Sequence, residues 1–333
     1  MKRIVALLFV SALTTIGSAQ TTLNGAGATF PYPIYSKWFS EYHASHPDIE
    51  INYQSIGSGG GIRQVTSGTV DFGASDGPMS DEQLASSKVK IVHIPTVMGS
   101  VVPAYNVPGV TQELKFTPEA LAGIYLGKIT SWNDNAIQSA NKDVKLPNTP
   151  IIVVHRSDGS GTSYVFTDYL SKVSPEWKSA AGKGTSVHWP VGLGAKGNEG
   201  VAGEIRQMEG SIGYVELIYA LQNKITYGTM KNAAGNFVKA SLESTTEAAK
   251  GVKIPADYRV SITNASGKNA YPIATFTWLL IPQKAADPKK GKILVDFLNW
   301  MLVDGQKEAS SLSYAPLPQE LVTKVKSTVQ QLH

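Results

Sequence analysis

The chain has 333 residues, of which 42% are hydrophobic and 17% charged. This composition is typical of a globular protein, and the length suits two domains better than one core. Thirty basic residues stand against 26 acidic ones, a balance without a nucleic-acid-binding footprint, so we expect no nucleic-acid partner. The absence of cysteine excludes disulfide bonds and a lipid-anchored N-terminal cysteine.

The first 19 residues are typical of a secretory signal peptide. Lys2 and Arg3 form a basic start, Ile4 to Val10 an apolar run, and Gly17 to Ala19 a small-residue cleavage site. The apolar run is too short to span a bilayer, and no second apolar stretch of membrane length follows. We therefore expect export of a soluble product that retains 28 basic and 26 acidic residues.

Short apolar runs alternate with helical patterns along the rest of the chain, which predicts an α/β fold. The expected strands lie at 49–55, 69–75, 151–155 and 276–282. Apolar residues at helical spacing predict helices at 34–42 and 294–302, and a terminal docking helix at 318–332. Two stretches rich in Gly and Asn, 196–203 and 230–236, are expected to be surface loops.

Two stretches place glycines and hydroxyls directly before a helical pattern. In "LNGAGATFPYP", Thr29 and the amide of Phe30 stand at the turn, and the prolines that follow suit a helix start. In "YQSIGSGGGI", Ser58 is the hydroxyl in a run of glycines. The free N–H groups and partial positive charge of a first helical turn attract anions, and glycine lets the backbone approach a ligand closely.

A third stretch of this design, "RSDGSGTSYVF" at 156–166, follows an expected strand and is the richest in donors. Ser160 and Thr162 add hydroxyls, and Arg156 adds a forked cationic donor. Asp158 is close enough along the chain to brace the guanidinium. One such loop alone is commonly an ordinary helix cap, but three in one chain favour a shared ligand, which we expect to be a small tetrahedral anion.

Asp76 follows the expected strand at 69–75 in a fourth turn. Its simplest role is to cap a helix over "MSDEQL", although Ser80 would serve instead. A carboxylate repels an anion beside it unless that anion carries a proton. Phosphate at neutral pH keeps at least one P–OH whereas sulfate keeps none, so Asp76 at the site would disfavour sulfate by roughly 10⁴-fold or more.

These stretches, together with "IYLGKITSWND", "WPVGLGAKGNEGVAG" and "GSIGYVE", resemble the PstS family, the phosphate-binding proteins of the bacterial high-affinity phosphate ABC transporter. The resemblance runs from about Thr22 to the C-terminal segment. One departure is Gly59, where relatives often carry a second serine. The resemblance implies phosphate contacts from Thr29, the Phe30 amide, Ser58, Asp76, Arg156, Ser160, Gly161 and Thr162, with Asp158 paired to Arg156.

For the fold, the resemblance implies an α/β periplasmic binding protein of type II, with two lobes and the ligand in the interdomain cleft. One domain would comprise residues 20–104 and 272–333, and the other residues 105–271. The lobes would close about a hinge with the anion between them. The implied function is that of a monomeric, non-enzymatic receptor in the periplasm, which needs no cofactor and delivers inorganic phosphate to an inner-membrane permease and its ATPase component.

Two alternatives for the function belong to other classes of protein. Residues 73–77 match G-x-S-x-G, the nucleophile elbow of serine hydrolases, with Ser75 as the nucleophile. Gly77 and Pro78 interrupt the helix that should follow such an elbow, which argues against a hydrolase. The alternative among binding proteins is a sulfate- or molybdate-type receptor, and Asp76 argues against it.

Two further motifs are set aside. The G-x-G-x-x-G match at 192–197 follows no clear strand, so an interdomain or surface loop is expected there in place of a dinucleotide site. His43 and His46 have the spacing of a metal-binding pair, but they stand at an expected helix end and no carboxylate completes a set. No metal site is therefore expected.

Overall fold

The computed structural model describes residues 20–333, so the expected signal peptide at residues 1–19 lies outside the described residues. The strands of the main sheet are β1 (Thr21–Gly27), β2 (Ile49–Ser55), β3 (Phe72–Ser75), β4 (Ile91–Asn106), β6 (Ile152–Arg156), β7 (Leu193–Ala195), β8 (Ser211–Glu216), β9 (Thr226–Tyr227) and β12 (Ala274–Pro282). Their order within the described range is β2-β1-β3-β12-β4-β8-β6-β7, with β9 also paired to β4.

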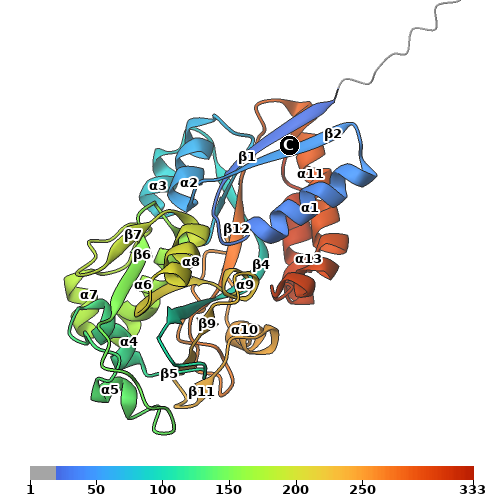
Figure 1. Cartoon of the computed structure of the whole chain (residues 1–333). Helices are drawn as coiled ribbons and strands as arrows, with labels where there is room; N and C mark the ends of the chain where they lie inside the picture. Colours follow the sequence, from blue (N-terminus) through green and yellow to red (C-terminus); the bar gives the residue numbers. More distant parts are fainter. Residues whose placement is uncertain (1–19) are drawn as a thin grey trace, which may run out of the picture.

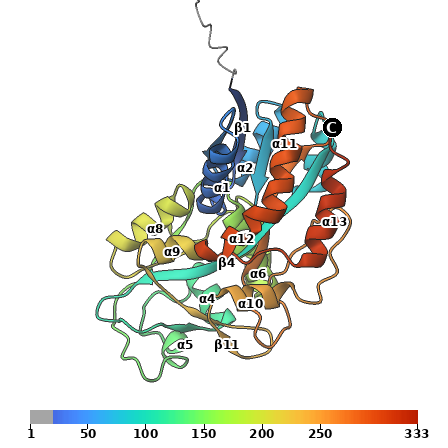
Figure 2. The same cartoon turned by 90° about the vertical axis from the view of Figure 1, so that its right-hand side faces the viewer.

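The long strand β4 connects the two halves of this sheet. From Ile91 to Ser100 it pairs antiparallel with β12, and from Val101 to Asn106 it pairs antiparallel with β8. We call β1, β2, β3, β12 and the helices packed on them the first lobe, and β6, β7, β8 and their helices the second lobe. Both views of the molecule show the first lobe above and the second below (Figures 1 and 2).

The first lobe is built from two distant parts of the chain. Its helices are α1 (Tyr32–Ser45), α2 (Ser58–Ser67), α3 (Asp81–Ser86), α11 (Pro288–Trp300), the π-helix η1 (Met301–Gly305), α12 (Gln306–Glu308), the 3₁₀ helix η2 (Ala309–Leu312) and α13 (Gln319–Val329). Helix α1 buries Ile34, Tyr35, Trp38, Phe39 and Tyr42 along one face. The periodic stripe predicted for 34–42 is therefore a packing face in the core.

The second lobe carries the helices α4 (Pro118–Tyr125), α5 (Asn135–Gln138), α6 (Gly161–Val173), α7 (Pro175–Ala180), α8 (Gly197–Gln207) and α9 (Leu217–Gln222). A separate three-stranded sheet contains β5 (Lys115–Phe116), β10 (Thr229–Lys231) and β11 (Phe237–Val238). Helix α10 (Leu242–Ala249) then leads the chain towards β12. No helix within residues 20–333 is both long and apolar enough to cross a bilayer.

Most of the predicted elements are confirmed, with shifted ends. Strand β2 has the predicted bounds, β6 and β12 differ from theirs by one or two residues, and β3 begins three residues late at Phe72. The predicted helix at 294–302 is the end of α11, which continues as η1. The predicted terminal helix is α13, whose buried residues include Leu321, Val322 and Val325.

The predicted surface loop at 196–203 is wrong, because Gly197 begins helix α8. Its glycines disfavour a helix by their own propensity, but Val201, Ala202 and Ile205 bury a helical face and override it. The stretch 230–236 is in part a turn, as predicted. Its Asn232, however, is buried and donates to the backbone carbonyls of Gly267, Lys268 and Ala270, which anchors the turn.

Candidate anion-binding site between the lobes

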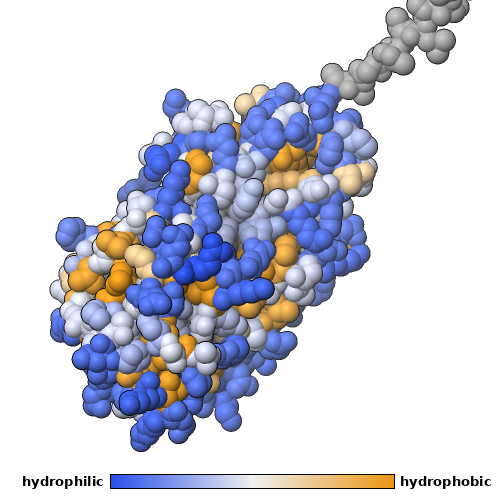
Figure 3. All heavy atoms as spheres, in the orientation of Figure 1, coloured by the Kyte–Doolittle hydropathy of each residue, from blue (hydrophilic) through white to orange (hydrophobic). Residues whose placement is uncertain are grey.

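The residues predicted to bind the ligand meet where the two lobes face each other. Thr29 and Phe30 lie between β1 and α1, Ser58 begins α2, and Asp76 directly follows β3. From the second lobe come Arg156, at the end of β6, and Ser160 to Thr162, where α6 begins. All eight predicted residues are buried. The face of the molecule drawn in Figure 3 is a mixture of polar and apolar patches.

Contacts across the cleft show how closely the two lobes approach. The amide of Gly59 donates to the carbonyl of Gly159 over 2.8 Å. Gly57 has a φ of +86°, which favours glycine, and a Cβ there would overlap the Asp158 carboxylate. A Cβ on Gly59 would stand 3.1 Å from the Cα of Gly159, so glycine in place of serine suits this tight approach.

Arg156 is held by Asp158 as predicted. Its Nε donates to Oδ1 over 2.7 Å and its Nη2 to Oδ2 over 2.5 Å, a bidentate pair. Asp158 also accepts from the amide of Gly197 at 3.1 Å. Burial opposes ionisation of Asp158, but the hydrogen bonds and charge of Arg156 outweigh it and lower the pKa of that carboxyl. Asp158 is therefore ionised and fixes the guanidinium from behind.

The serine hydroxyls act as acceptors towards the protein. Ser160 caps α6 by accepting from the amide of Ser163 at 3.0 Å, and Ser58 accepts from the amide of Asp76 at 3.2 Å. A hydroxyl has one hydrogen to donate. The Ser160 hydroxyl has no acceptor among the described residues, so its hydrogen is available to a ligand, whereas the Ser58 hydroxyl lies close enough to the Asp76 carboxylate to lower its pKa by hydrogen bonding. The first amides of α6 add N–H donors at the positive end of a helix.

Asp76 is the acceptor in this group of donors. Its Oδ1 accepts from the hydroxyl of Thr277 over 2.8 Å, while the buried Oδ2 has no hydrogen-bond partner among the described residues. Burial raises the pKa of this carboxyl from 3.8 to about 7, against the lowering effects of Thr277, Arg156 and Ser58. The helix-capping role considered for Asp76 belongs to Ser80, which caps α3 in a capping box with Gln83.

Three tyrosines bind the carbonyls of the Ala28–Phe30 loop. Tyr53 donates to the carbonyl of Ala28 at 2.8 Å, Tyr219 to that of Thr29 at 2.5 Å and Tyr314 to that of Phe30 at 2.6 Å. The amide of Ala28 donates to the carbonyl of Ala74 at 3.0 Å, whereas the amide of Phe30 has no acceptor among the described residues. The amide of Phe30 is thus available as the donor that the resemblance implies.

Five residues that contact the predicted site were not predicted from the sequence. They are Asn198, Thr277 and the three tyrosines. Asn198 lies in the first turn of α8, in the stretch expected to be a surface loop. The sequence feature that could have identified Asn198 is the glycine-rich segment that also matches G-x-G-x-x-G. Thr277 gave a weaker signal as one hydroxyl in the apolar strand β12, whose residues are almost all buried.

The geometry at Ser75 argues against the hydrolase alternative. Its hydroxyl is buried and donates to the carbonyl of Gly77 at 2.5 Å. The ring of His93 accepts from the amide of Met79, so its Nε2 does not activate Ser75. The paired histidines at the end of α1 contact the backbone. A ring nitrogen of His43 lies 2.6 Å from the carbonyl of Ile49, and one of His46, the residue after the helix, lies 3.1 Å from that of Tyr42.

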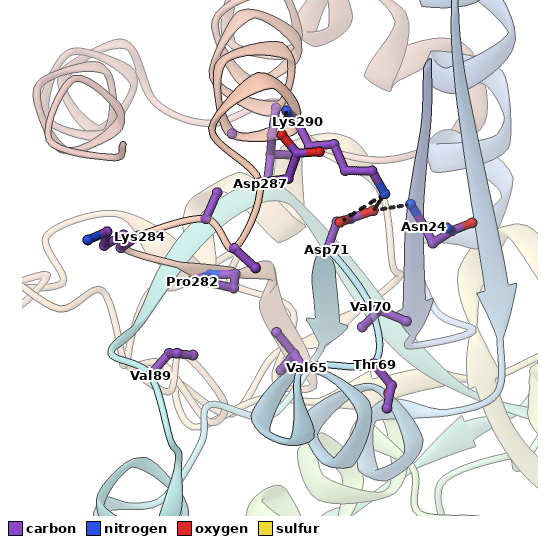
Figure 4. A pocket seen from close by; sticks show the side chains of 15 residues that line it. Asn24, Val65, Thr69, Val70, Asp71, Val89, Pro282, Lys284, Asp287 and Lys290 are labelled. Atoms are coloured by element: carbon purple, nitrogen blue, oxygen red, sulfur yellow. Dashed lines mark hydrogen bonds and ion pairs between the residues drawn. The ribbon is translucent and has the colours of Figure 1, made fainter. Parts of the chain in front are cut away.

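A separate hollow lies among β1, β3, α2 and α11 (Figure 4). Asp71 accepts from the amide of Asn24 at 2.8 Å and from Nζ of Lys290 at 3.0 Å across its wall. Val65, Val70 and Leu294 contribute apolar lining. Asp71 and Lys290 pair with each other, as Figure 4 shows, so neither charge is left for a ligand.

Comparison with known proteins places these features in a family. Residues 14–304 match a model described as a PBP superfamily domain. The chain is 48% identical to the phosphate-binding protein PstS of Xylella fastidiosa over 94% of this chain and 87% of that protein. It is 45% identical to PstS of Haemophilus influenzae, over 96% of both chains. PstS of Methanocaldococcus jannaschii is 38% identical over 90% of this chain and 83% of its own length.

Solved structures share the fold at lower sequence identity. A high affinity periplasmic phosphate-binding protein (PfluDING) bound with phosphate superposes with a TM-score of 0.75, at 21% identity over 92% of this chain and 93% of that one. A putative phosphate ABC transporter substrate-binding protein from Clostridium perfringens, with bound phosphate, gives a TM-score of 0.65 at 17% identity, over 90% of this chain and 100% of that one. These similarities show the two-lobed binding-protein fold.

Burial of Asp76 predicts a specific pH dependence of stability. Because its pKa is raised to about 7, the carboxyl favours the fold below pH 4, and this contribution is lost as pH rises through about 7. We expect Asp76→Asn, which cannot ionise, to equal the wild type near pH 4 and to melt about 3 °C or more above it at pH 8, without ligand. Thermal unfolding from pH 4 to 8 measures this, and parallel curves would contradict it.

The limited space around Gly161 can be tested by adding a side chain there. A Cβ on Gly161 would overlap the hydroxyl of Ser58 and the carboxylate of Asp76, although alanine itself favours a helix. We expect Gly161→Ala to weaken binding of inorganic phosphate by more than about tenfold without unfolding α6, as measured by calorimetry and circular dichroism. Gly203→Ala is the matched control, since a Cβ there meets nothing within 4 Å. Equal affinities in both variants would remove Gly161 from the site.

Proposed function

Since the chain belongs to the PstS phosphate-binding proteins of the PBP superfamily, we propose that it captures inorganic phosphate between its lobes and delivers it to the permease of an ABC transporter. The observation that carries this proposal is the buried Oδ2 of Asp76, which has no hydrogen-bond partner among the described residues and lies among donors. Hydrogen phosphate has oxygens for the donors and one P–OH for that oxygen. Sulfate and molybdate carry no corresponding O–H group at neutral pH, which argues against a receptor for those anions.

The proposed contacts are those expected from the sequence. The phosphate oxygens accept hydrogen bonds from seven residues: the hydroxyls of Thr29, Ser58, Ser160 and Thr162, the amides of Phe30 and Gly161, and the guanidinium of Arg156. Asp76 accepts a hydrogen bond from the phosphate P–OH. Burial raises the pKa of this carboxyl to about 7, so the ionised form is costly unless it has a hydrogen-bond donor, which the P–OH supplies.

We propose that binding proceeds by closure of two domains, residues 20–104 with 272–333, and residues 105–271. Donors from both domains meet only when the cleft is closed, and the bond between Gly59 and Gly159 supports such a closed state. A charge-assisted hydrogen bond contributes roughly 1.5–3 kcal/mol, and micromolar binding needs about 8 kcal/mol. A handful of such bonds therefore suffices for tight binding with the cost of closure included.

The proposed biological role is that of a binding protein and not an enzyme. The mature chain would act as a soluble monomer in the periplasm, without a lipid anchor or cofactor. Its partners would be phosphate, the inner-membrane permease and the ATPase component of the transporter. The occupied hydroxyl of Ser75 supports the absence of hydrolase activity at the G-x-S-x-G motif.

The proposal predicts strong discrimination between phosphate and sulfate. In calorimetric titrations at pH 8, where Asp76 with its pKa of about 7 is mostly ionised and cannot donate to sulfate, we expect saturable phosphate binding at micromolar or lower concentration and no competition from millimolar sulfate. Asp76→Asn should allow sulfate to compete, because an amide can donate to an oxyanion that carries no proton. Equal competition by sulfate in the wild type would remove Asp76 from its role.

Removal of the Arg156 guanidinium is predicted to lower the affinity for phosphate. We expect Arg156→Ala to weaken phosphate binding at least about tenfold, because at least one charge-assisted bond is lost and Asp158 then faces the anion without its partner. Arg206→Ala removes the same charge from an exposed position on α8 and serves as the control. If the two variants bind equally well in calorimetry, the guanidinium does not contact phosphate.

A further inference from the structure

Asn198 is a fully buried amide that lies between the two lobes. Its Oδ1 accepts from the amide of Glu216 over 2.9 Å. Glu216 is itself fixed, because its Oε2 caps α9 by accepting from the amide of Ile218 at 2.8 Å. Only the amide oxygen can accept the Glu216 hydrogen, so this bond determines that the Nδ2 of Asn198 points the other way, towards the cleft.

The two hydrogens of Nδ2 go to one hydroxyl from each lobe. Nδ2 donates to Oγ1 of Thr29 over 2.8 Å and to Oγ1 of Thr162 over 3.0 Å. The backbone amide of Asn198 adds a second bond to Thr29, at 3.2 Å. Thr162 receives its second bond from Nη1 of Arg156, at 3.3 Å. Each threonine oxygen thus accepts two hydrogen bonds from protein donors.

This arrangement determines the direction of both hydroxyl hydrogens. A hydroxyl has two acceptor positions and one hydrogen, and both acceptor positions are filled in Thr29 and in Thr162. Neither hydroxyl has a recorded acceptor among residues 20–333. The hydrogen of each must therefore point away from Asn198 and Arg156, into the ligand position.

We propose that Asn198 is a positioning residue that fixes the hydroxyls of Thr29 and Thr162 as donors to the bound anion. This inference rests on the proposed function, because it assigns how two of the phosphate contacts are oriented. Asn198 itself does not need to touch the phosphate. By orienting one hydroxyl from each lobe, it prepares the site for an acceptor and disfavours ligands that would donate to these threonines.

Tyr219 provides a contrast within the same structure. Its hydroxyl also crosses the cleft to Thr29, but it donates to the backbone carbonyl and not to the side-chain hydroxyl. A residue that only holds the lobes together would behave like Tyr219. A residue that acts through the threonine hydroxyls must lose its effect when those hydroxyls are removed, and this difference can be measured.

The test is a double-mutant cycle between Asn198 and Thr162. Phosphate affinity is measured by calorimetry for Asn198→Ala, Thr162→Val and the double variant, with Tyr219→Phe and its double variant with Thr162→Val as the control cycle. We expect Asn198→Ala to weaken binding about tenfold in the wild type, but clearly less once the Thr162 hydroxyl is absent. The effect of Tyr219→Phe should be the same in both backgrounds. Equal effects of Asn198→Ala in both backgrounds would overturn the inference.

A second variant keeps the shape of the side chain. Asn198→Asp can still accept from the Glu216 amide, but its other oxygen accepts where Nδ2 donated, so the threonine hydrogens turn towards it. We expect this variant to bind phosphate more weakly than Asn198→Ala, because the threonine hydrogens turn away from the ligand and the new carboxylate also repels the anion. The double-mutant cycle separates the first effect from the second, and tighter binding by Asn198→Asp than by Asn198→Ala would overturn the inference. Thermal unfolding without ligand identifies variants that fail to fold, and the cycle is then run with Asn198→Ser in place of the failed variant.

The outcome separates the two proposals. A wild-type protein that does not bind phosphate would contradict the proposed function. Wild-type binding combined with additive effects of Asn198 and Thr162, or with Asn198→Asp binding better than Asn198→Ala, would contradict the role of Asn198 alone.

Discussion

The buried cleft holds many more hydrogen-bond donors than acceptors, and the rest of the site depends on this imbalance. Four hydroxyls, a guanidinium and the first amides of α6 converge where protein atoms offer few partners. A buried donor left without a partner costs about 1–3 kcal/mol, and an anion with several oxygens removes this cost for many donors at once. Closure of the lobes and capture of the anion are thereby coupled, while Asp76, the exception among the donors, makes the protonation state of the anion part of its recognition.

Groups outside the direct contacts maintain the imbalance by occupying acceptors. Tyr53, Tyr219 and Tyr314 take the carbonyls of the loop that carries Thr29 and Phe30, so that this loop presents hydrogens. Asp158 restrains the guanidinium of Arg156 and is held in turn by the amide of Gly197 at the start of α8. The supporting residues come from both lobes and from distant parts of the chain. The site is therefore preorganised by the fold as a whole, and each donor has little freedom to turn elsewhere.

The sequence predicts those parts of the fold and the site that depend on neighbouring residues. Alternation in 49–55 corresponds to β2, and the hydroxyl and glycine residues at 58 and 160–162 begin helices, because turn and capping chemistry is local. The assignment of Gly161 as a ligand contact required the family resemblance. Asn198 was not predicted, since glycine-rich 196–203 disfavours a helix that packing against β8 nevertheless stabilises. Thr277 and the tyrosines could not be predicted either, because each acts on a residue at least 25 positions away.

The shared strand β4 limits how independently the two lobes can exist. A cut in the chain near Ser100 would separate β12 from β3 and from the first half of β4, and both pieces would then have an unprotected sheet edge. Such edges recruit other strands and lead to aggregation. The two fragments are thus poor modules for engineering, and the first lobe could be grafted onto a foreign partner only with both of its chain segments.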